Sequence, residues 1–438
     1  MRQRETKEKY LTSRYLFLLF SDSQEKIDSS FRFLLISRSA RSMSLVFVTL
    51  AFSLYLNTLG YSLVFIGLIY VLIVLFNMLF SLWLGFLGDR LGYSRILIFG
   101  EILPLFGLAG LTISTNVYVI AASAMMAGIT GTAGGMRGAF SPGSTAFIAS
   151  NWPNEVNRVT KLANMTVVAS LSSIVGGLLL ISHGYLTPFL GSINTFRLLF
   201  GVSSVLILIS LIALLFLKER RRPRKTSKVM KRKSFSYLLR IILANAVNGA
   251  GIGIAIPLLP LWFEIRFGIS TSYVGYIFTI AYAATALGSF LSGRYLNTTK
   301  ISAISVSATT RLFQGVLLVA IAFSPLAMVA LSVYALRSAV AGLGTPMRSA
   351  ISVRGIGNED YGTASSIQSV ATRASQSTSG LSGYLMDVYL PSTLLIGGAL
   401  QAAGSMVYYW LIKGWERQNN TSGEEGSKRG PGLADGQK

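Results

Sequence analysis

Apolar runs of about 20 residues recur along this 438-residue chain, and each is long enough to cross ~30 Å of hydrocarbon as a helix. The composition agrees, because 52% of the residues are hydrophobic and only 13% are charged, with a mean hydropathy of +0.56. Helices fit these runs better than the shorter strands of a membrane barrel. The expected spans are residues 33–57, 63–84, 95–113, 117–149, 159–182, 195–217, 236–262, 272–293, 301–323, 327–350, 363–386 and 391–412. The sequence therefore predicts an all-α membrane protein with about twelve transmembrane helices.

Basic residues dominate the net charge of +22 and gather at Arg2 to Arg41, at Lys218 to Lys233 and in the C-terminal tail. The segments expected on the other side of the membrane carry almost none, with Arg197 and Arg266 as exceptions. This asymmetry follows the positive-inside rule. It predicts a multi-pass protein of the plasma membrane, with both termini and the central linker in the cytoplasm and the lipid bilayer as a partner. A nucleic-acid partner is the weaker interpretation, because the linker lacks interleaved aromatic residues and a recognisable binding fold.

The same pattern divides the chain into five parts. The two ends are polar: the first lacks a signal-peptide cleavage site, and the last has the composition of a disordered segment. The expected parts are a cytoplasmic N-terminal extension (1–31), an N-terminal six-helix bundle (32–217), a basic cytoplasmic linker (218–235), a C-terminal six-helix bundle (236–413) and a disordered cytoplasmic tail (414–438).

The two halves of the chain repeat each other. A shift of 204 residues carries Pro142 onto Pro346 and also aligns Gly176 with Gly380, whereas near the first helices a shift of 208 places Gly67 on Gly275. If both copies of a repeat begin on the same side of the membrane, each copy contains an even number of crossings, and six fits this chain. The sequence therefore predicts two pseudosymmetric six-helix bundles.

One polar loop, between the second and third spans, reads G-F-L-G-D-R-L-G-Y-S-R-I-L from Gly85 to Leu97. It resembles the signature loop of the major facilitator superfamily, G-x-L-x-D-R-x-G-R-x-x-x-L. Tyr93 stands where the family usually has a base, and Arg95 takes over two residues later. An ordinary positive-inside turn is the alternative, but it explains neither the aspartate nor the glycine spacing. The expected gating-loop residues, with the degenerate second copy, are Gly85, Asp89, Arg90, Gly92, Arg95 and Arg294.

The resemblance implies a secondary transporter that alternates between inward-open and outward-open shapes as one half rocks against the other. It also implies a central cavity lined mainly by the first, second, fourth and fifth helices of each half. In the superfamily the loop aspartate interacts with the start of the eleventh helix, which places Asp89 near Gly362 to Ser366 in this chain.

Four arginines lie well inside apolar spans, namely Arg137, Arg311, Arg337 and Arg373. Each would cost about 2.5–3.5 kcal/mol at the centre of an inserted helix, so each needs a cavity, a carboxylate or a substrate. On the helix arrangement that the resemblance implies, Arg137, Arg337 and Arg373 can reach the cavity, whereas Arg311 on the ninth helix is expected to be a structural charge. For Arg337, bonding to the carbonyls of a neighbouring helix is an open alternative.

Glu101 is the one acidic residue clearly inside a span, which makes it the candidate for ion coupling. An equally good interpretation pairs it with a nearby base. Arg38 and Arg41 lie near the inner end of the first span and are expected to extend to the interface. The neutral candidates for substrate contact, for which hydrogen bonding between helices is the alternative, are Asn57, Asn164, Asn245, Asn248 and Gln368.

Several chemistries are disfavoured by what the chain lacks. The sequence contains no cysteine, a single histidine at His183 and no G-x-x-x-x-G-K-[ST] loop, so neither a metal centre, a cofactor nor direct use of ATP is expected. His183 is expected to be an interface residue, and no nucleophile with a base and an orienting group is visible, so an enzyme is not expected.

The charge of the expected cavity favours a substrate class. Three arginines against almost no carboxylates favour an organic anion or an anionic amphiphile as the small-molecule substrate, moved with a proton or a sodium ion as the coupling ion. A proton-coupled exporter of hydrophobic compounds is the alternative. A non-transporting membrane sensor or a membrane-embedded enzyme on the same fold is less favoured.

Overall fold

The computed structural model describes residues 2–129, 140–152, 155–219, 232–295, 302–356 and 361–428, and every regular element in these ranges is helical. The elements are α1 (Arg2–Thr58), α2 (Leu63–Leu91), α3 (Tyr93–Ile113), α4 (Val117–Ala127), α5 (Phe140–Asn151), α6 (Glu155–Leu190), α7 (Ser192–Leu215), α8 (Arg232–Ala255), α9 (Leu259–Phe267), α10 (Thr271–Tyr295), α11 (Ala303–Ala322), α12 (Ala327–Arg354), α13 (Tyr361–Gln376), the 3-10 turn η1 (Ser377–Ser379), α14 (Gly380–Val388) and α15 (Ser392–Lys428).

Within the described ranges, ten helical segments are long and apolar enough to span a membrane. The other two expected crossings are interrupted helices. The fourth is divided between α4 and α5, on either side of residues 130–139, and the eleventh is divided among α13, η1 and α14. The helical class and the number of crossings therefore agree with the sequence prediction.

Local sequence sets the limits of these helices, as α4 illustrates. The side chain of Asn116 accepts a hydrogen bond from the backbone N–H of Tyr118 at 2.9 Å, which caps the first turn. The helix ends at Gly128, whose φ of +69° is the left-handed conformation that glycine adopts without a Cβ penalty.

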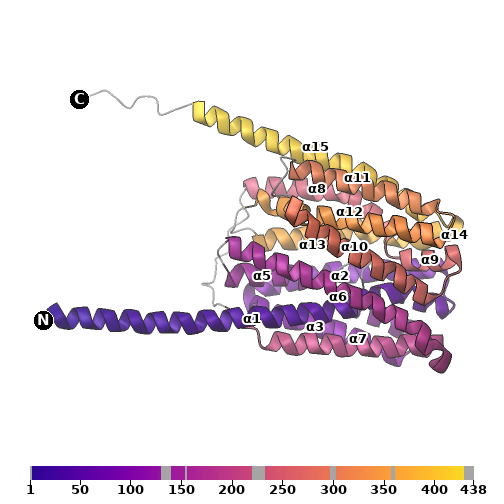
Figure 1. Cartoon of the computed structure of the whole chain (residues 1–438), viewed down its shortest axis with the longest axis horizontal. Helices are drawn as coiled ribbons and strands as arrows, with labels where there is room; N and C mark the ends of the chain where they lie inside the picture. The colour runs from indigo at the N-terminus through magenta and orange to yellow at the C-terminus, as the bar shows by residue number, and fades with distance from the viewer. Residues whose placement is uncertain are drawn as a thin grey trace.

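The helices form two bundles, α1 to α7 in the first half and α8 to α15 in the second (Figure 1). The start of α1 and the end of α15 project from the same end of the molecule in Figure 1, as an even number of crossings requires. We call this the linker end, because α7 ends and α8 begins there, and the opposite end the far end.

The buried core joins the halves at the far end. One apolar cluster contains residues of both halves, among them Tyr55 and Phe200 from the first and Trp262 and Phe278 from the second. Towards the linker end each half has a cluster of its own, built around Trp152 in the first half and around residues such as Tyr408 in the second. The described core thus connects the two bundles at one end and keeps them separate at the other.

Both ends of the chain are more helical than the sequence suggests. α1 runs without a break from Arg2 into the first span, and α15 continues to Lys428 where a disordered tail was expected from residue 414. Trp415 packs against Tyr237 with ring centroids 4.4 Å apart. Good helix formers such as Glu416, Arg417 and Gln418 follow it and let the helix continue.

Two further expectations about polar side chains are wrong. Arg38 and Arg41 do not extend to the interface, since only 1% and 2% of their surfaces are exposed; both face the buried carboxylate of Glu101. His183 is buried as well, with its ring 4.1 Å from that of Phe196 and its Nε2 3.3 Å from the carbonyl oxygen of Ser192. In both cases a partner inside the bundle replaces the water that an interface would supply.

Candidate functional site

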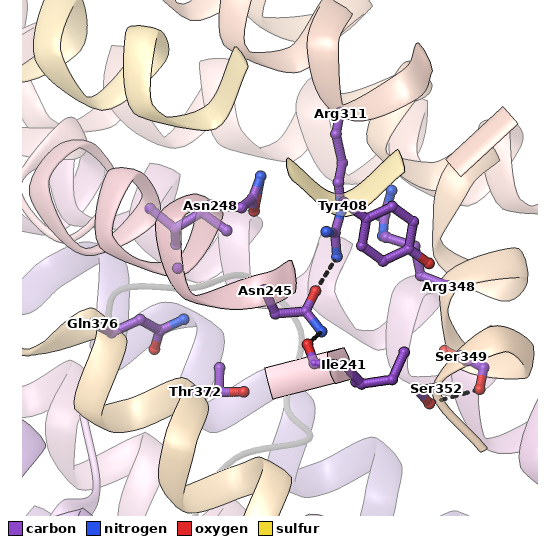
Figure 2. Close-up of a pocket in the computed structure, with 12 residues that line it drawn as sticks. Ile241, Asn245, Asn248, Arg311, Arg348, Ser349, Ser352, Thr372, Gln376 and Tyr408 are labelled. Atoms are coloured by element: carbon purple, nitrogen blue, oxygen red, sulfur yellow. Dashed lines mark hydrogen bonds between the residues drawn. The ribbon is translucent and has the colours of Figure 1, made fainter. Parts of the chain in front are cut away.

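A polar cavity of about 410 Å³ lies inside the second half, between α8, α11, α12, α13 and α15 (Figure 2). Its size is in the range of small-molecule sites. The wall residues are Ile241, Asn245, Asn248, Gly249, Ile252, Arg311, Arg348, Ser349, Ser352, Thr372, Gln376 and Tyr408. The wall therefore combines two arginines with amides and hydroxyls and includes no aspartate or glutamate.

One face of α8 forms one side of the cavity. Ile241, Asn245, Asn248 and Ile252 recur every three or four residues, which is the spacing of one helix face. The Nδ2 of Asn245 donates to the carbonyl oxygen of Ile241 at 2.7 Å, so its Oδ1 is turned towards α11. At Gly249 a Cβ atom would lie 2.8 Å from the Cβ of Ser375, so glycine is what lets α13 approach here.

The two arginines of the wall are held by neutral partners. Arg311 is 9% exposed, donates from Nη2 to the Oδ1 of Asn245 at 2.5 Å and lies 4.2 Å from the ring centroid of Tyr408. Arg348 donates from Nη2 to the carbonyl oxygen of Ala341 at 3.0 Å and to the hydroxyl of Thr345 at 2.8 Å. The charge of Arg311 acts on Arg348, so two like charges share one wall. A cavity of this kind favours an anionic ligand.

The cavity ends where the eleventh helix is interrupted. Thr372 and Gln376 contribute to the wall from the last turns of α13, and η1 follows at once. Thr378 in η1 donates to the carbonyl oxygen of Ala250 on α8 at 2.8 Å, which ties the interruption to α8.

Of the residues expected to bind substrate, the structure brings Asn245 and Asn248 to this cavity. Gln368 lies beside it and donates to the carbonyl oxygen of Ser352 at 3.0 Å. Arg337 adopts the structural alternative, donating to the carbonyl oxygen of Gln314 at 3.2 Å and to the side chain of Gln401 at 3.1 Å.

The remaining candidates lie elsewhere. Arg373 is nine-tenths buried on α13 but is not part of the wall. Asn164 is exposed on α6, and Asn57 lies at the far end, within reach of Glu264. Arg137 falls outside the described residues.

Arg311, Arg348 and Tyr408 are among the wall residues that the sequence prediction missed. Arg311 was assigned to a structural role because the ninth helix was expected to lie away from the cavity. Arg348 is not among the sequence candidates, although it lies inside the expected span 327–350. Tyr408 carries no signal in the sequence, since tyrosines are common in spans. The signal in the sequence was the presence of arginines inside apolar spans, which applies to both Arg311 and Arg348.

Glu101 lies within the first half and away from this cavity. Its carboxylate pairs with the guanidinium of Arg41 and accepts a hydrogen bond from Ser210 at 2.5 Å. Ser210 is in turn 2.7 Å from the hydroxyl of Ser37. Glu101 thus forms an ion pair with a basic residue, which is the interpretation that the sequence left open beside a role in ion coupling.

The gating loop is described in part. Gly92 joins α2 to α3 with a φ of +94°, a conformation suited to glycine. Glu219, just beyond α7, accepts a hydrogen bond from the backbone N–H of Ser94 at 2.9 Å and so caps α3, while Arg95 is exposed. The structure does not describe the side chains of Asp89, Arg90 and Arg294, nor the surroundings of Gly85. The expected contact of Asp89 with α13 therefore stays a prediction.

Two bundles of six membrane-length helices, with a cavity between the helices of one bundle, are the architecture of a membrane transporter. The chain belongs to the Major Facilitator Superfamily, whose family model matches residues 34–380. It is therefore a multi-pass membrane protein of a family of transporters that move small molecules.

Solved structures share the fold at low sequence identity. The chain is similar to the human organic anion transporter MFSD10 (TETRAN), with a TM-score of 0.62 and 14% identity over 89% of this chain and 99% of that one. It is also similar to an auto-inhibited peptide transporter of the POT family, with a TM-score of 0.68 and 11% identity over 88% and 97%. No curated protein matches the chain by sequence.

Proposed function

We propose that this protein is a secondary transporter for a small organic anion, driven by an ion gradient and working by alternating access. The observation that carries the proposal is the pair Arg311 and Arg348 in a cavity wall without a carboxylate. Burying two guanidinium groups in an apolar bundle costs free energy, and an anionic substrate would offset that cost by pairing with them. The structural neighbour MFSD10 is an organic anion transporter, but at 14% identity the likeness supports the fold only.

The orientation is part of the proposal. The basic linker and both basic termini favour the cytoplasm at the linker end of a plasma-membrane protein. The wall residues Arg348, Ser349 and Ser352 belong to the last turns of α12, towards the linker end. A substrate would then reach the cavity from the cytoplasmic side when that end is open, and rocking of the halves would expose the same cavity to the other side.

Uptake of labelled mono- and dicarboxylates and organic phosphates into proteoliposomes, with and without a pH gradient, tests the proposal. Arg311→Gln and Arg348→Gln should each weaken the apparent affinity for the transported anion by about 10- to 100-fold, because a charge-assisted hydrogen bond contributes about 1.5–3 kcal/mol. Arg266→Gln is the matched control, since Arg266 is exposed at the far end, and it should transport like the wild type.

The rival function has a distinct signature. If no anion enters the vesicles and a lipophilic dye is expelled when a pH gradient is applied, the protein is an exporter of hydrophobic compounds. If anion uptake is intact in both arginine variants, the cavity is not the substrate site.

A further inference from the structure

The carboxyl group of Glu264 lies between the two halves at the far end. Glu264 belongs to α9 in the second half, and its Oε2 accepts a hydrogen bond from the hydroxyl of Thr271 at 3.2 Å. The side chain of Asn57, at the end of α1 in the first half, is within hydrogen-bonding reach of the same carboxyl. α9 and α1 pack against each other here, so groups from both bundles share one titratable side chain.

The sequence of α9 fixes this position. Pro260 lies in the first turn of the short helix and Gly268 ends it in the left-handed conformation, with a φ of +60°. Trp262 is fully buried and donates from its indole N–H to the carbonyl oxygen of Leu390 at 2.9 Å, which anchors the helix. Glu264 is consequently half-buried beside α1 rather than free in water.

Among the described residues, the groups that act on the Glu264 carboxyl are the neutral side chains of Thr271 and Asn57, and no cation is among them. The titratable residues on or near the adjoining elements are Tyr55 and Tyr61 by the end of α1, Arg197 beside Tyr55 on α7, Tyr273 on α10 and Arg266 on α9 itself. The tyrosines are neutral at physiological pH, and Arg266 is exposed, two positions along the helix and so not on the face of Glu264. Burial raises the pKa of the Glu264 carboxyl above its ordinary value, more than the hydrogen bonds from Thr271 and Asn57 lower that pKa.

The far end is closed around this group. The backbone N–H of Gly184 on α6 donates to the hydroxyl of Ser272 on α10 at 2.8 Å, and that hydroxyl donates to the carbonyl oxygen of Ile181 at 2.9 Å. Gly67 on α2 similarly approaches the backbone of α14. Opening this end must part α1 from α9, which separates Asn57 from Glu264 and admits water to the carboxyl.

We propose that Glu264 is a proton-binding site that controls the closure of the far end. The carboxylate takes up one proton as the halves close and releases it as they part, on the same side of the membrane, so the proton regulates opening and is not carried across. The proposal rests on the proposed function only in assuming that the far end opens and closes.

The direction of the effect follows from linkage. The Glu264 carboxyl has its higher pKa in the closed state, so the closed state binds more protons and is favoured as the pH falls. As the pH rises from the ordinary glutamate range through the closed-state value, the ratio of closed to open molecules falls by about tenfold for each unit of difference between the two pKa values. Above that range the ratio is constant.

Spin-label distances in the full-length protein test the site without any substrate. The chain has no cysteine, so Tyr118→Cys and Met328→Cys give one label on each half. Both positions are exposed, by 81% and 73%, at the far-end starts of α4 and α12. In lipid nanodiscs, the short-distance population should grow as the pH falls. Glu264→Gln should hold the short distance at every pH, because its side chain is neutral.

Two further variants make the test specific. Asp387→Asn removes an exposed carboxylate of α14 and should titrate as the parent does. Asn57→Leu removes a hydrogen bond that favours the ionised carboxyl, so its midpoint should move to higher pH. The proposal is overturned if Glu264→Gln keeps the parent's pH dependence, or if Asn57→Leu leaves the midpoint in place. Failure of anion uptake in proteoliposomes would bear on the proposed function and not on this result.

Discussion

Arg41 and Glu101 form a buried ion pair in the first half. Both side chains are almost fully buried, and Ser210 supplies a further hydrogen bond to the carboxylate. A buried pair of this kind costs desolvation free energy that its own attraction roughly offsets. Its main consequence is therefore that neither partner can be removed alone, which suits a rigid element of a bundle better than a group that releases protons in each cycle.

Removing one partner of this pair should be costly. We expect Glu101→Gln to lower the free energy of unfolding by about 3–5 kcal/mol, because the charge of Arg41 would stay buried without its counter-charge. The double variant Arg41→Met with Glu101→Leu should regain part of the loss, because it removes the buried charge of Arg41 but leaves that of Arg38, which also faces Glu101. Thermal unfolding in detergent, followed by tryptophan fluorescence, measures both. A stable Glu101→Gln protein, or a double variant no better than the single one, would contradict this account.

At the scale of helices, the halves meet through glycines that the internal repeat relates. At Gly67 a Cβ atom would lie 3.0 Å from the carbonyl oxygen of Gly380, and at Gly275 it would lie 2.8 Å from the backbone nitrogen of Ile181. Each contact joins the second helix of one half to the fifth helix of the other. In a membrane, small residues allow such close approach of backbones. Both copies of the repeat therefore have a glycine at the position where their second helix packs against the other half.

Gly275→Ala should therefore favour the open far end. The added methyl group meets backbone atoms of α6, which cannot move aside as a flexible side chain would. We expect a larger long-distance population between spin labels at positions 118 and 328. Gly414→Ala is the control, because nothing lies within 4 Å of a Cβ atom there. If both variants gave the parent's distances, close packing at Gly275 would not limit closure.

At the scale of the whole molecule, alternating access requires that the tightly packed far end opens in every cycle. A Cβ atom at Gly184 would lie 3.1 Å from that of Ser272 across the two halves. Disulfides have a Cβ–Cβ separation of about 3.5–4.5 Å, so the two helices need to part by a few tenths of an ångström to form one. The absence of native cysteines makes a single engineered bridge possible.

The pair Gly184→Cys and Ser272→Cys should form a disulfide on oxidation that stops transport in proteoliposomes, and a reductant should restore it. Each single-cysteine variant should be insensitive to oxidant, which controls for damage elsewhere. Undiminished transport by the fully cross-linked protein would exclude rocking about this end.

The sequence alone determined the membrane class, the number of crossings and the two-fold repeat, because these depend on the length of apolar runs and on internal similarity, which are properties of the chain read in one dimension. It also supplied Asn245 and Asn248 as polar groups of the cavity, and it kept open the pairing of Glu101 with a base. Only the tertiary structure decided that Arg311 and Arg348 share a wall while Arg337 bonds to Gln314 and Gln401. It likewise brought Asn57 to Glu264. Hydropathy fixes where a helix crosses the membrane but not which way each side chain faces around its axis, and that rotation is set by packing between helices far apart in the sequence.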